Sequence, residues 1–233
     1  LKKDKIPFIL FVSTREIGKH GYMNWEQIKE VASHDGVTIG NHSHSHEYLI
    51  DWKDSEIKSD IKKSIEIFKE KLGYSPKVFS YPFGEYSNNL KNIISDLDFD
   101  FAFGQHSGVI DVSKDFLELP RFPINEKYGD LKRFKSIIRT LPLPFENITP
   151  ENRYLQNNEN PPVVKIKFFD NLINFKNINC YSNEGNIWRK SDIKFSAINE
   201  ITILLKEKFK SERGRINCSI WHKSKNWRWL GIQ

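Results

Sequence analysis

The stretch Val37-Thr38-Ile39-Gly40-Asn41-His42-Ser43-His44-Ser45-His46 carries three histidines directly after a short apolar segment. Residues 37–40 predict a short buried strand, which places the histidines at its carboxyl end. His42 and His46 are four residues apart, so a helical turn would put both imidazoles on one face, where they can bind one divalent metal ion. His44 would then point elsewhere. The alternative is that all three histidines are solvated on a loop.

The segments around this stretch alternate between strand-like and helix-like patterns over residues 1–140. We predict strands at residues 6–13, 37–40, 78–81, 99–103 and 117–119, and helices at 25–33, 54–72, 90–97 and 131–140. The helix at 54–72 has apolar residues at three- and four-residue steps and is closed by Gly73. Strands separated by helices indicate parallel βα units, in which chemistry gathers at the carboxyl ends of the strands.

A second segment suited to chemistry follows the predicted strand at 78–81. It reads Ser80-Tyr81-Pro82-Phe83-Gly84-Glu85-Tyr86. Pro82 fixes one turn residue and Gly84 permits a sharp bend, so the turn can present backbone N–H groups toward a site, as an oxyanion hole requires. The alternative is an ordinary tight turn.

The pattern changes after residue 140. Five prolines in residues 141–162 predict a linker. Residues 163–233 predict a small all-β, sandwich-like domain, with strands at 163–169, 178–181, 193–195, 201–205, 215–220 and 227–232. Cys180 and Cys218 form either one disulfide or two buried thiols, and their β-like surroundings favour the disulfide.

Three of the six tryptophans, Trp221, Trp227 and Trp229, cluster near the end of the chain. Their rings either stack on sugars at a carbohydrate-binding surface or fill the core of the small domain.

Composition excludes several classes of protein. The chain has 233 residues, of which 38% are hydrophobic and 13% aromatic, so a wholly disordered chain is excluded. It has no apolar run of about 18 residues, so no transmembrane segment is predicted. The net charge of +6 comes from scattered lysines rather than a dense basic block, which argues against a nucleic-acid partner.

Residues 39–46 and 79–84 together resemble the motifs of the polysaccharide deacetylase family, also called the NodB-homology domain. Residues 6–12 and 21–25 agree with the same family in order and spacing. The resemblance covers about residues 1–125, and residues 79–84 look most like the subgroup that deacetylates surface and biofilm N-acetylglucosamine polymers.

The resemblance implies a distorted (β/α) barrel and hydrolysis of acetyl groups from a polysaccharide with N-acetylhexosamine residues. It implies a divalent metal, usually zinc, held by one Asp and two His; His42 and His46 match the histidines, and Phe83 matches the residue whose backbone N–H faces the oxyanion. The partner would be an acetylated polysaccharide or oligosaccharide, at a secreted, periplasmic or cell-surface location. Rival readings are a non-catalytic carbohydrate-binding protein on a degenerate scaffold and an O-acetyl glycan esterase.

The chain departs from the family pattern in several places. The family's paired aspartates, one a metal ligand and one the base, would precede Leu1 together with the first barrel strand, so we expect the 233-residue chain to be inactive or crippled. His106 is the best substitute for the family's general acid; the alternative is a plain loop histidine. Arg121 is a candidate to supply a positive charge near the base, since Ser80 stands where many members have Arg. The side chains that could line the sugar groove are Tyr81, Glu85 and Tyr86.

Overall fold

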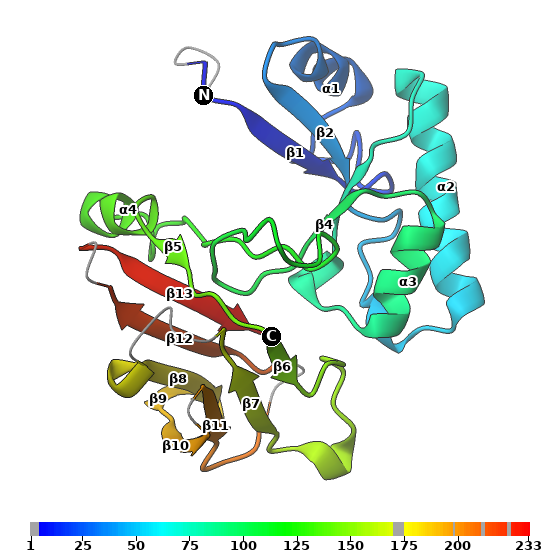
Figure 1. Ribbon diagram of the computed structural model, residues 1–233. Coiled ribbons are helices and arrows are strands. Elements are labelled where there is room, and N and C mark those ends of the chain that lie inside the picture. The colour runs from blue at the N-terminus through cyan, green and yellow to red at the C-terminus, as the bar shows by residue number, and fades with distance from the viewer. Residues whose placement is uncertain (1–4, 170–174, 198, 211–212, 223–224) are drawn as a thin grey trace. The chain divides into compact units, whose positions relative to one another are not determined.

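The computed structural model describes residues 5–169, 175–197, 199–210, 213–222 and 225–233 (Figure 1). The chain divides into two compact units. The first comprises the described part of Leu1–Gly104 together with Asp115–Leu119, and the second comprises Gln105–Lys114 and Pro120–Gln233. Residues 105–114 and 120–140, which the sequence pattern assigns to the first domain, therefore group with the second unit.

The first unit contains a parallel sheet whose strands follow one another in chain order, β1-β2-β3-β4. The strands are β1 (Phe8–Val12), β2 (Val37–Asn41), β3 (Val78–Ser80) and β4 (Phe101–Phe103), and the connecting helices are α1 (Trp25–Ala32), α2 (Asp54–Leu72) and α3 (Asn88–Asp96). Two short 3-10 helices, η1 (Leu49–Asp51) and η2 (Pro82–Gly84), complete the unit. The predicted parallel βα units are confirmed, and a closed barrel stays a prediction.

Local sequence signals set the bounds of these helices. Asn24 caps α1, because its side chain accepts a hydrogen bond from the Gln27 N–H and the Gln27 side chain accepts one from the Asn24 N–H, both at 2.9 Å. Gly73 ends α2 with a left-handed φ of 81°. The predicted strand at 117–119 is reduced to a single parallel bridge between Phe103 and Leu119.

The second unit holds one helix, α4 (Leu131–Ile137), and two sheets, ordered β10-β11-β7-β6 and β5-β13-β12-β8-β9 in the described residues (Figure 1). Neighbouring strands pair antiparallel, except β5 with β13. The strands are β5 (Leu141–Pro142), β6 (Asn147–Thr149), β7 (Val163–Lys167), β8 (Asn179–Glu184), β9 (Ile187–Lys190), β10 (Asp192–Ala197), β11 (Glu200–Leu204), β12 (Ile216–Trp221) and β13 (Trp227–Ile232), with 3-10 turns η3 (Asn157–Glu159) and η4 (Phe175–Asn177). One buried apolar cluster draws side chains from both sheets, among them Ile166 and Ile203 of the first and Ile220 and Ile232 of the second.

The segment predicted as a linker contributes to these sheets. Strands β5 and β6 both lie within residues 141–162, and Leu143 and Ile148 are buried in the shared apolar cluster. The prolines interrupt the segment, but the apolar residues between them pack as core.

The two cysteines are bonded to each other. Cys180 on β8 lies directly opposite Cys218 on the neighbouring strand β12, and the pair is buried. The disulfide favoured by the sequence is confirmed. Among the helices of the described residues, none combines the length and the apolar character that crossing a membrane requires.

Candidate functional site

The structure brings His42 and His46 together at the carboxyl end of β2. Their ring centroids lie 4.8 Å apart with the planes at 73°. The helical turn expected from their spacing is not what joins them, because residues 42–48 form an irregular loop with left-handed φ values at Ser43 (65°) and His46 (56°). Both backbone reversals fold the loop back on itself, and this places the two imidazoles side by side.

A backbone carbonyl orients the His42 ring. His42 Nδ1 lies 2.6 Å from the carbonyl oxygen of Ser80, the last residue of β3. A carbonyl only accepts hydrogen bonds, so Nδ1 carries the proton and Nε2 carries the lone pair suited to a metal. The bond links the first motif to the second across two neighbouring strands.

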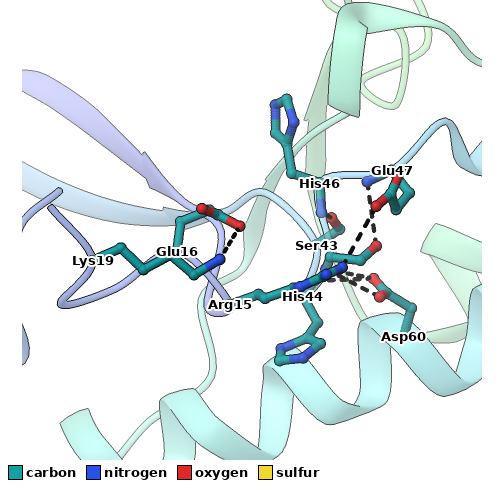
Figure 2. Close-up of polar contacts among 9 residues, drawn as sticks. Arg15, Glu16, Lys19, Ser43, His44, His46, Glu47 and Asp60 are labelled. Carbon is teal, nitrogen blue, oxygen red and sulfur yellow. Dashed lines mark hydrogen bonds and ion pairs between the residues drawn. The ribbon is translucent and has the colours of Figure 1, made fainter. Parts of the chain in front are cut away.

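Asp60, on α2, holds the backbone of the histidine loop (Figure 2). Its Oδ1 accepts a hydrogen bond from the His44 N–H at 2.9 Å, and its Oδ2 accepts one from the Ser45 N–H at 3.1 Å. Ser43 Oγ accepts a further bond from the His46 N–H at 2.9 Å. Asp60 is only 9% exposed, so these charge-assisted bonds lie in a shielded setting.

Asn41, the last residue of β2, anchors the start of the loop. Its side chain is fully buried, and its Oδ1 accepts hydrogen bonds from the Ser43 N–H at 2.9 Å and from Ser64 Oγ at 3.0 Å. Ser64, like Asp60, belongs to α2. The helix between the two motifs therefore fixes the loop from one side with two polar residues.

His44 points away from the pair, as its position in the sequence predicts. Figure 2 shows its ring on the opposite side of the loop from the His46 ring. Its Nδ1 lies 2.8 Å from Thr14 Oγ1. Burial lowers the pKa of His44, and Lys63 and Arg15 add to the lowering, while Asp60 opposes it.

A pocket of about 510 Å³ opens beside the two imidazoles, within the first unit. Apolar side chains of β1 and α1 and the loop between them form most of its wall, and His42, Ser45 and His46 of the histidine loop add polar groups. Glu16 brings a carboxylate to the lining and accepts a hydrogen bond from Lys19 Nζ at 2.9 Å (Figure 2). A ligand in this pocket could therefore reach the two imidazoles.

The donor set fits a divalent metal in part. His42 and His46 supply two imidazoles, ligands that zinc accepts readily. Within the described ranges, no group of three His, Cys, Asp or Glu side chains is placed to hold an ion. The described residues therefore offer two of the three protein ligands that a catalytic zinc usually has.

The turn after β3 lies against His46. Phe83 has a left-handed backbone, with φ 58°, and its ring centroid is 5.0 Å from that of His46 and 5.7 Å from that of Tyr48. The Gly84 N–H donates to the Tyr81 carbonyl at 2.8 Å, which closes the turn. The structure thus places Phe83 beside the histidine pair.

The three side chains expected to line a sugar groove are buried instead. Tyr81 is 0% exposed, Tyr86 4% and Glu85 8%. The Tyr81 hydroxyl donates to the Leu117 carbonyl at 2.8 Å, and burial raises the pKa of this phenol. Tyr81 and Tyr86 belong to the apolar core of the first unit, and their ring centroids lie 5.3 Å apart. These side chains support the turn rather than offering a surface to a sugar.

His106 and Arg121 both belong to the second unit. The Arg121 N–H donates to the His106 carbonyl at 3.0 Å. Burial lowers the pKa of His106 to about 3, and the nearby charges of Arg153, Arg215 and Arg121 add to the lowering. At neutral pH this imidazole is uncharged and lacks the acidic proton of the imidazolium form, which counts against a general acid; the two catalytic roles stay predictions.

Two functional positions were not singled out from the sequence. Asp60 and Asn41 organise the histidine loop; Asn41 lies within the motif at residues 39–46 but was given no role there, and Asp60 lies outside both motifs. Asp60 does leave a signal: it lies between Ile57 and Ile61 on the buried face of α2. A carboxylate on the apolar face of a helix needs polar partners, and here these are loop N–H groups.

Comparisons with known proteins agree with the geometry. The family model for polysaccharide deacetylase matches residues 1–102. The peptidoglycan-N-acetylglucosamine deacetylase of Bacillus cereus is 37% identical over 62 residues, which are 27% of this chain and 22% of that relative. The chain thus spans less than a quarter of this curated relative's length.

The fold is similar to two solved structures. IcaB from Ammonifex degensii is 25% identical with a TM-score of 0.51, over 55% of this chain and 60% of that one. The Streptococcus pyogenes deacetylase PplD, in complex with acetate, is 20% identical with a TM-score of 0.54, over 58% and 60% of the two chains; at this identity the likeness concerns the fold alone. The matched residues 1–102 carry the histidine pair and the Pro82 turn, and over these residues the chain is similar to polysaccharide deacetylases.

Proposed function

We propose that this protein hydrolyses acetyl groups from N-acetylhexosamine residues of a polysaccharide, with a divalent metal, most simply zinc, at His42 and His46. The observation that carries the proposal is the meeting of the two family motifs: the His42–His46 pair lies at the end of β2, and Phe83, after β3, contacts His46. The closed barrel of the family is part of the same proposal.

The residues of the chain have separate tasks in this proposal. His42 and His46 hold the metal, and the Ser80 carbonyl keeps His42 in the tautomer that exposes the Nε2 lone pair. When bound, a divalent metal polarises a carbonyl and lowers the pKa of water. The Phe83 backbone N–H stabilises the charge that develops on the acetyl oxygen, a role that depends on the turn and not on the side chain.

The acetylated polysaccharide would be met outside the cytoplasm, at a secreted, periplasmic or cell-surface location. The Cys180–Cys218 disulfide supports this, because disulfides persist in oxidising compartments. The curated relative is named for an N-acetylglucosamine polymer of the cell wall, which supports the substrate class.

Metal binding tests the site. We expect the double variant His42→Ala, His46→Ala to bind zinc at least about tenfold more weakly than the parent protein, measured by calorimetry and by metal content after dialysis. His20→Ala, which removes an exposed histidine from a loop, is the matched control and should leave zinc binding unchanged. Unchanged metal content in the double variant would sink the site assignment.

Acetate release tests the reaction. The protein as its gene encodes it, with zinc added, should release acetate from an N-acetylglucosamine hexamer, and the His42→Ala variant should not. Acetylated xylan serves as the comparison substrate. Release from xylan alone would favour an O-acetyl esterase, and release from neither, with the hexamer still bound, would favour a carbohydrate-binding protein.

A further inference from the structure

A second cleft, of about 770 Å³, is lined entirely by residues of the second unit. Its volume falls in the range of sites that bind small molecules. Residues of α4, β8, β9, β12 and β13 contribute to the lining, together with the chain just before α4.

The aromatic content of the cleft is high. Four rings contribute to its lining: Phe122, Tyr128, Trp188 and Trp229. Trp188 is 44% exposed, so its ring offers a surface to a ligand. Large flat rings with a polar edge suit a ligand with an apolar face and a polar rim, and a pyranose ring has both.

Amides stand beside these rings. Asn183 and Asn217 also contribute to the lining, and Asn183 lies directly opposite Trp188 in the pairing of β8 with β9. The Asn183 Oδ1 is shielded from solvent and accepts no hydrogen bond from a described residue. Amide side chains in a lining can exchange hydrogen bonds with the hydroxyl and acetamido groups of a saccharide.

One wall of the cleft is held in place by Arg133 of α4. Its Nη1 donates to the carbonyls of Pro123 at 2.9 Å and Tyr128 at 2.6 Å, and its guanidinium lies 5.3 Å from the Tyr128 ring centroid. These bonds fix the segment before α4, so this wall is formed before a ligand arrives.

Another part of the lining is held by Trp229 of β13. Its Nε1–H donates to the Ser107 carbonyl at 2.9 Å, and its ring meets that of Phe122 edge-on at 5.7 Å. Gly231 allows this close approach, because a Cβ there would lie 2.0 Å from the Ser107 carbonyl oxygen. The Trp229 and Phe122 rings are therefore held in place, which reduces the entropy lost on binding.

The charges of the lining favour one class of saccharide. Lys132, Arg133 and Arg215 contribute positive charge against the single carboxylate of Asp130. An ammonium group would be repelled here, whereas an uncharged acetamido group would not. The cleft is suited to an acetylated amino sugar and unsuited to its deacetylated, cationic product.

We propose that this cleft binds the N-acetylated saccharide chain and discriminates against the deacetylated one. The choice of saccharide rests on the proposed function, and the binding surface does not. The cleft would hold acetylated polymer near the enzyme and release it once the acetyl groups are gone.

Calorimetry on the intact chain tests this inference, with an N-acetylglucosamine hexamer and a glucosamine hexamer as probes. We expect Trp188→Ala to weaken binding of the acetylated hexamer by about tenfold or more, as for an aromatic anchor. Trp188→Phe should restore part of the affinity. Trp221→Ala is the matched control, since Trp221 is another exposed tryptophan, outside the described lining of the cleft. The glucosamine hexamer should bind more weakly than the acetylated one.

Three results would overturn the inference: no binding of the acetylated hexamer, binding that Trp188→Ala leaves unchanged, or equal affinity for the two hexamers. Repeating the titration in the His42→Ala, His46→Ala variant separates the two proposals. Binding that persists without any acetate release by the parent protein supports the cleft and contradicts the proposed function. Acetate release without Trp188-dependent binding supports the proposed function and contradicts the binding cleft.

Discussion

The bond between His42 Nδ1 and the Ser80 carbonyl shows what a single residue can contribute at this site. The acceptor is backbone, so it depends on the register of β3 and not on the side chain at position 80. The resemblance to the family concerns the side chain at this position, which is Ser80 here and Arg in many members. The role that the structure reveals belongs to an atom that every residue type has, which is why the sequence did not show it.

Asp60 carries the first residue-scale prediction. Asp60→Ala leaves the N–H groups of His44 and Ser45 without their acceptors, so we expect the free energy of unfolding to fall by about 2–3 kcal/mol. Urea denaturation followed by circular dichroism measures this. Asp60→Asn keeps one carbonyl oxygen and should lose less.

Zinc affinity provides a second measurement on the same variants. Asp60 acts on the histidines only through the loop, so both substitutions should weaken zinc binding in the same order as they weaken folding. An Asp60→Ala protein with the parent's stability and zinc affinity would show that the loop holds its shape without this carboxylate.

His106 carries a prediction about pH. Its pKa is about 3 in the folded protein against an ordinary 6.5, because burial and Arg153, Arg215 and Arg121 oppose the charged form. Below pH 6.5 the unfolded chain takes up a proton that the folded chain does not, so this residue lowers stability progressively as pH falls from 6.5 toward 3.

Thermal unfolding between pH 7.5 and 5 measures the effect, a window chosen to lie above the titration of ordinary carboxylates. The melting temperature of the parent protein should fall with pH more steeply than that of His106→Gln. The exposed His20→Gln serves as the control and should keep the parent's slope. Parallel curves for the parent and His106→Gln would contradict the burial of an uncharged imidazole.

At the scale of elements, the long amphipathic helix and the strands around the histidines could be predicted closely. The helix α2 runs from Asp54 to Leu72, as its periodicity and Gly73 indicate. Strands β5, β6 and β9 were missed, since proline or exposed residues mask their pattern. Strands β5 and β6 are defined by partner strands further along the chain, which local sequence does not reveal, whereas β9 pairs with the adjacent β8 across the turn at residues 185–186.

Gly40 carries the element-scale prediction. Gly40 of β2 lies directly opposite Phe11 of β1 in the sheet, and a Cβ at position 40 would lie only 2.5 Å from the Phe11 ring. Gly40→Ala should therefore displace Phe11 and cost about 1–3 kcal/mol, as overpacking does. Chemical denaturation measures the loss. A second substitution, Phe11→Leu, should recover part of it, and failure to do so would place the clash elsewhere.

At the scale of the whole molecule, the division into units was the least predictable feature. The pairing of β13 with β5, and the bond from Trp229 to Ser107 across 122 residues of sequence, draw residues 105–114 and the segment after Pro120 into the second unit. The change of composition at residue 140 marks only where the prolines become dense. Non-local packing, and not composition, decides which unit a segment joins.

The disulfide carries the prediction at this scale. Cys180 and Cys218 are separated by 38 residues, and a cross-link over that distance is expected to stabilise the second unit by about 4 kcal/mol in the chain-entropy account. The double variant Cys180→Ala, Cys218→Ala should thus unfold at lower urea concentration, as reported by tryptophan fluorescence. The parent protein in reductant should behave like this variant. An unchanged midpoint would mean that the strand pairing alone sets the stability.

The arrangement of α2 between the two motifs has a use in protein engineering. Gly73 turns the chain at the amino end of β3, whereas His42 and the Ser80 carbonyl meet at the carboxyl ends of β2 and β3. A fluorescent tag or epitope inserted just after Gly73 would enter an exposed turn at the opposite edge of the sheet from the histidines. The protein could then be tracked by its tag while the histidine loop stays as it is.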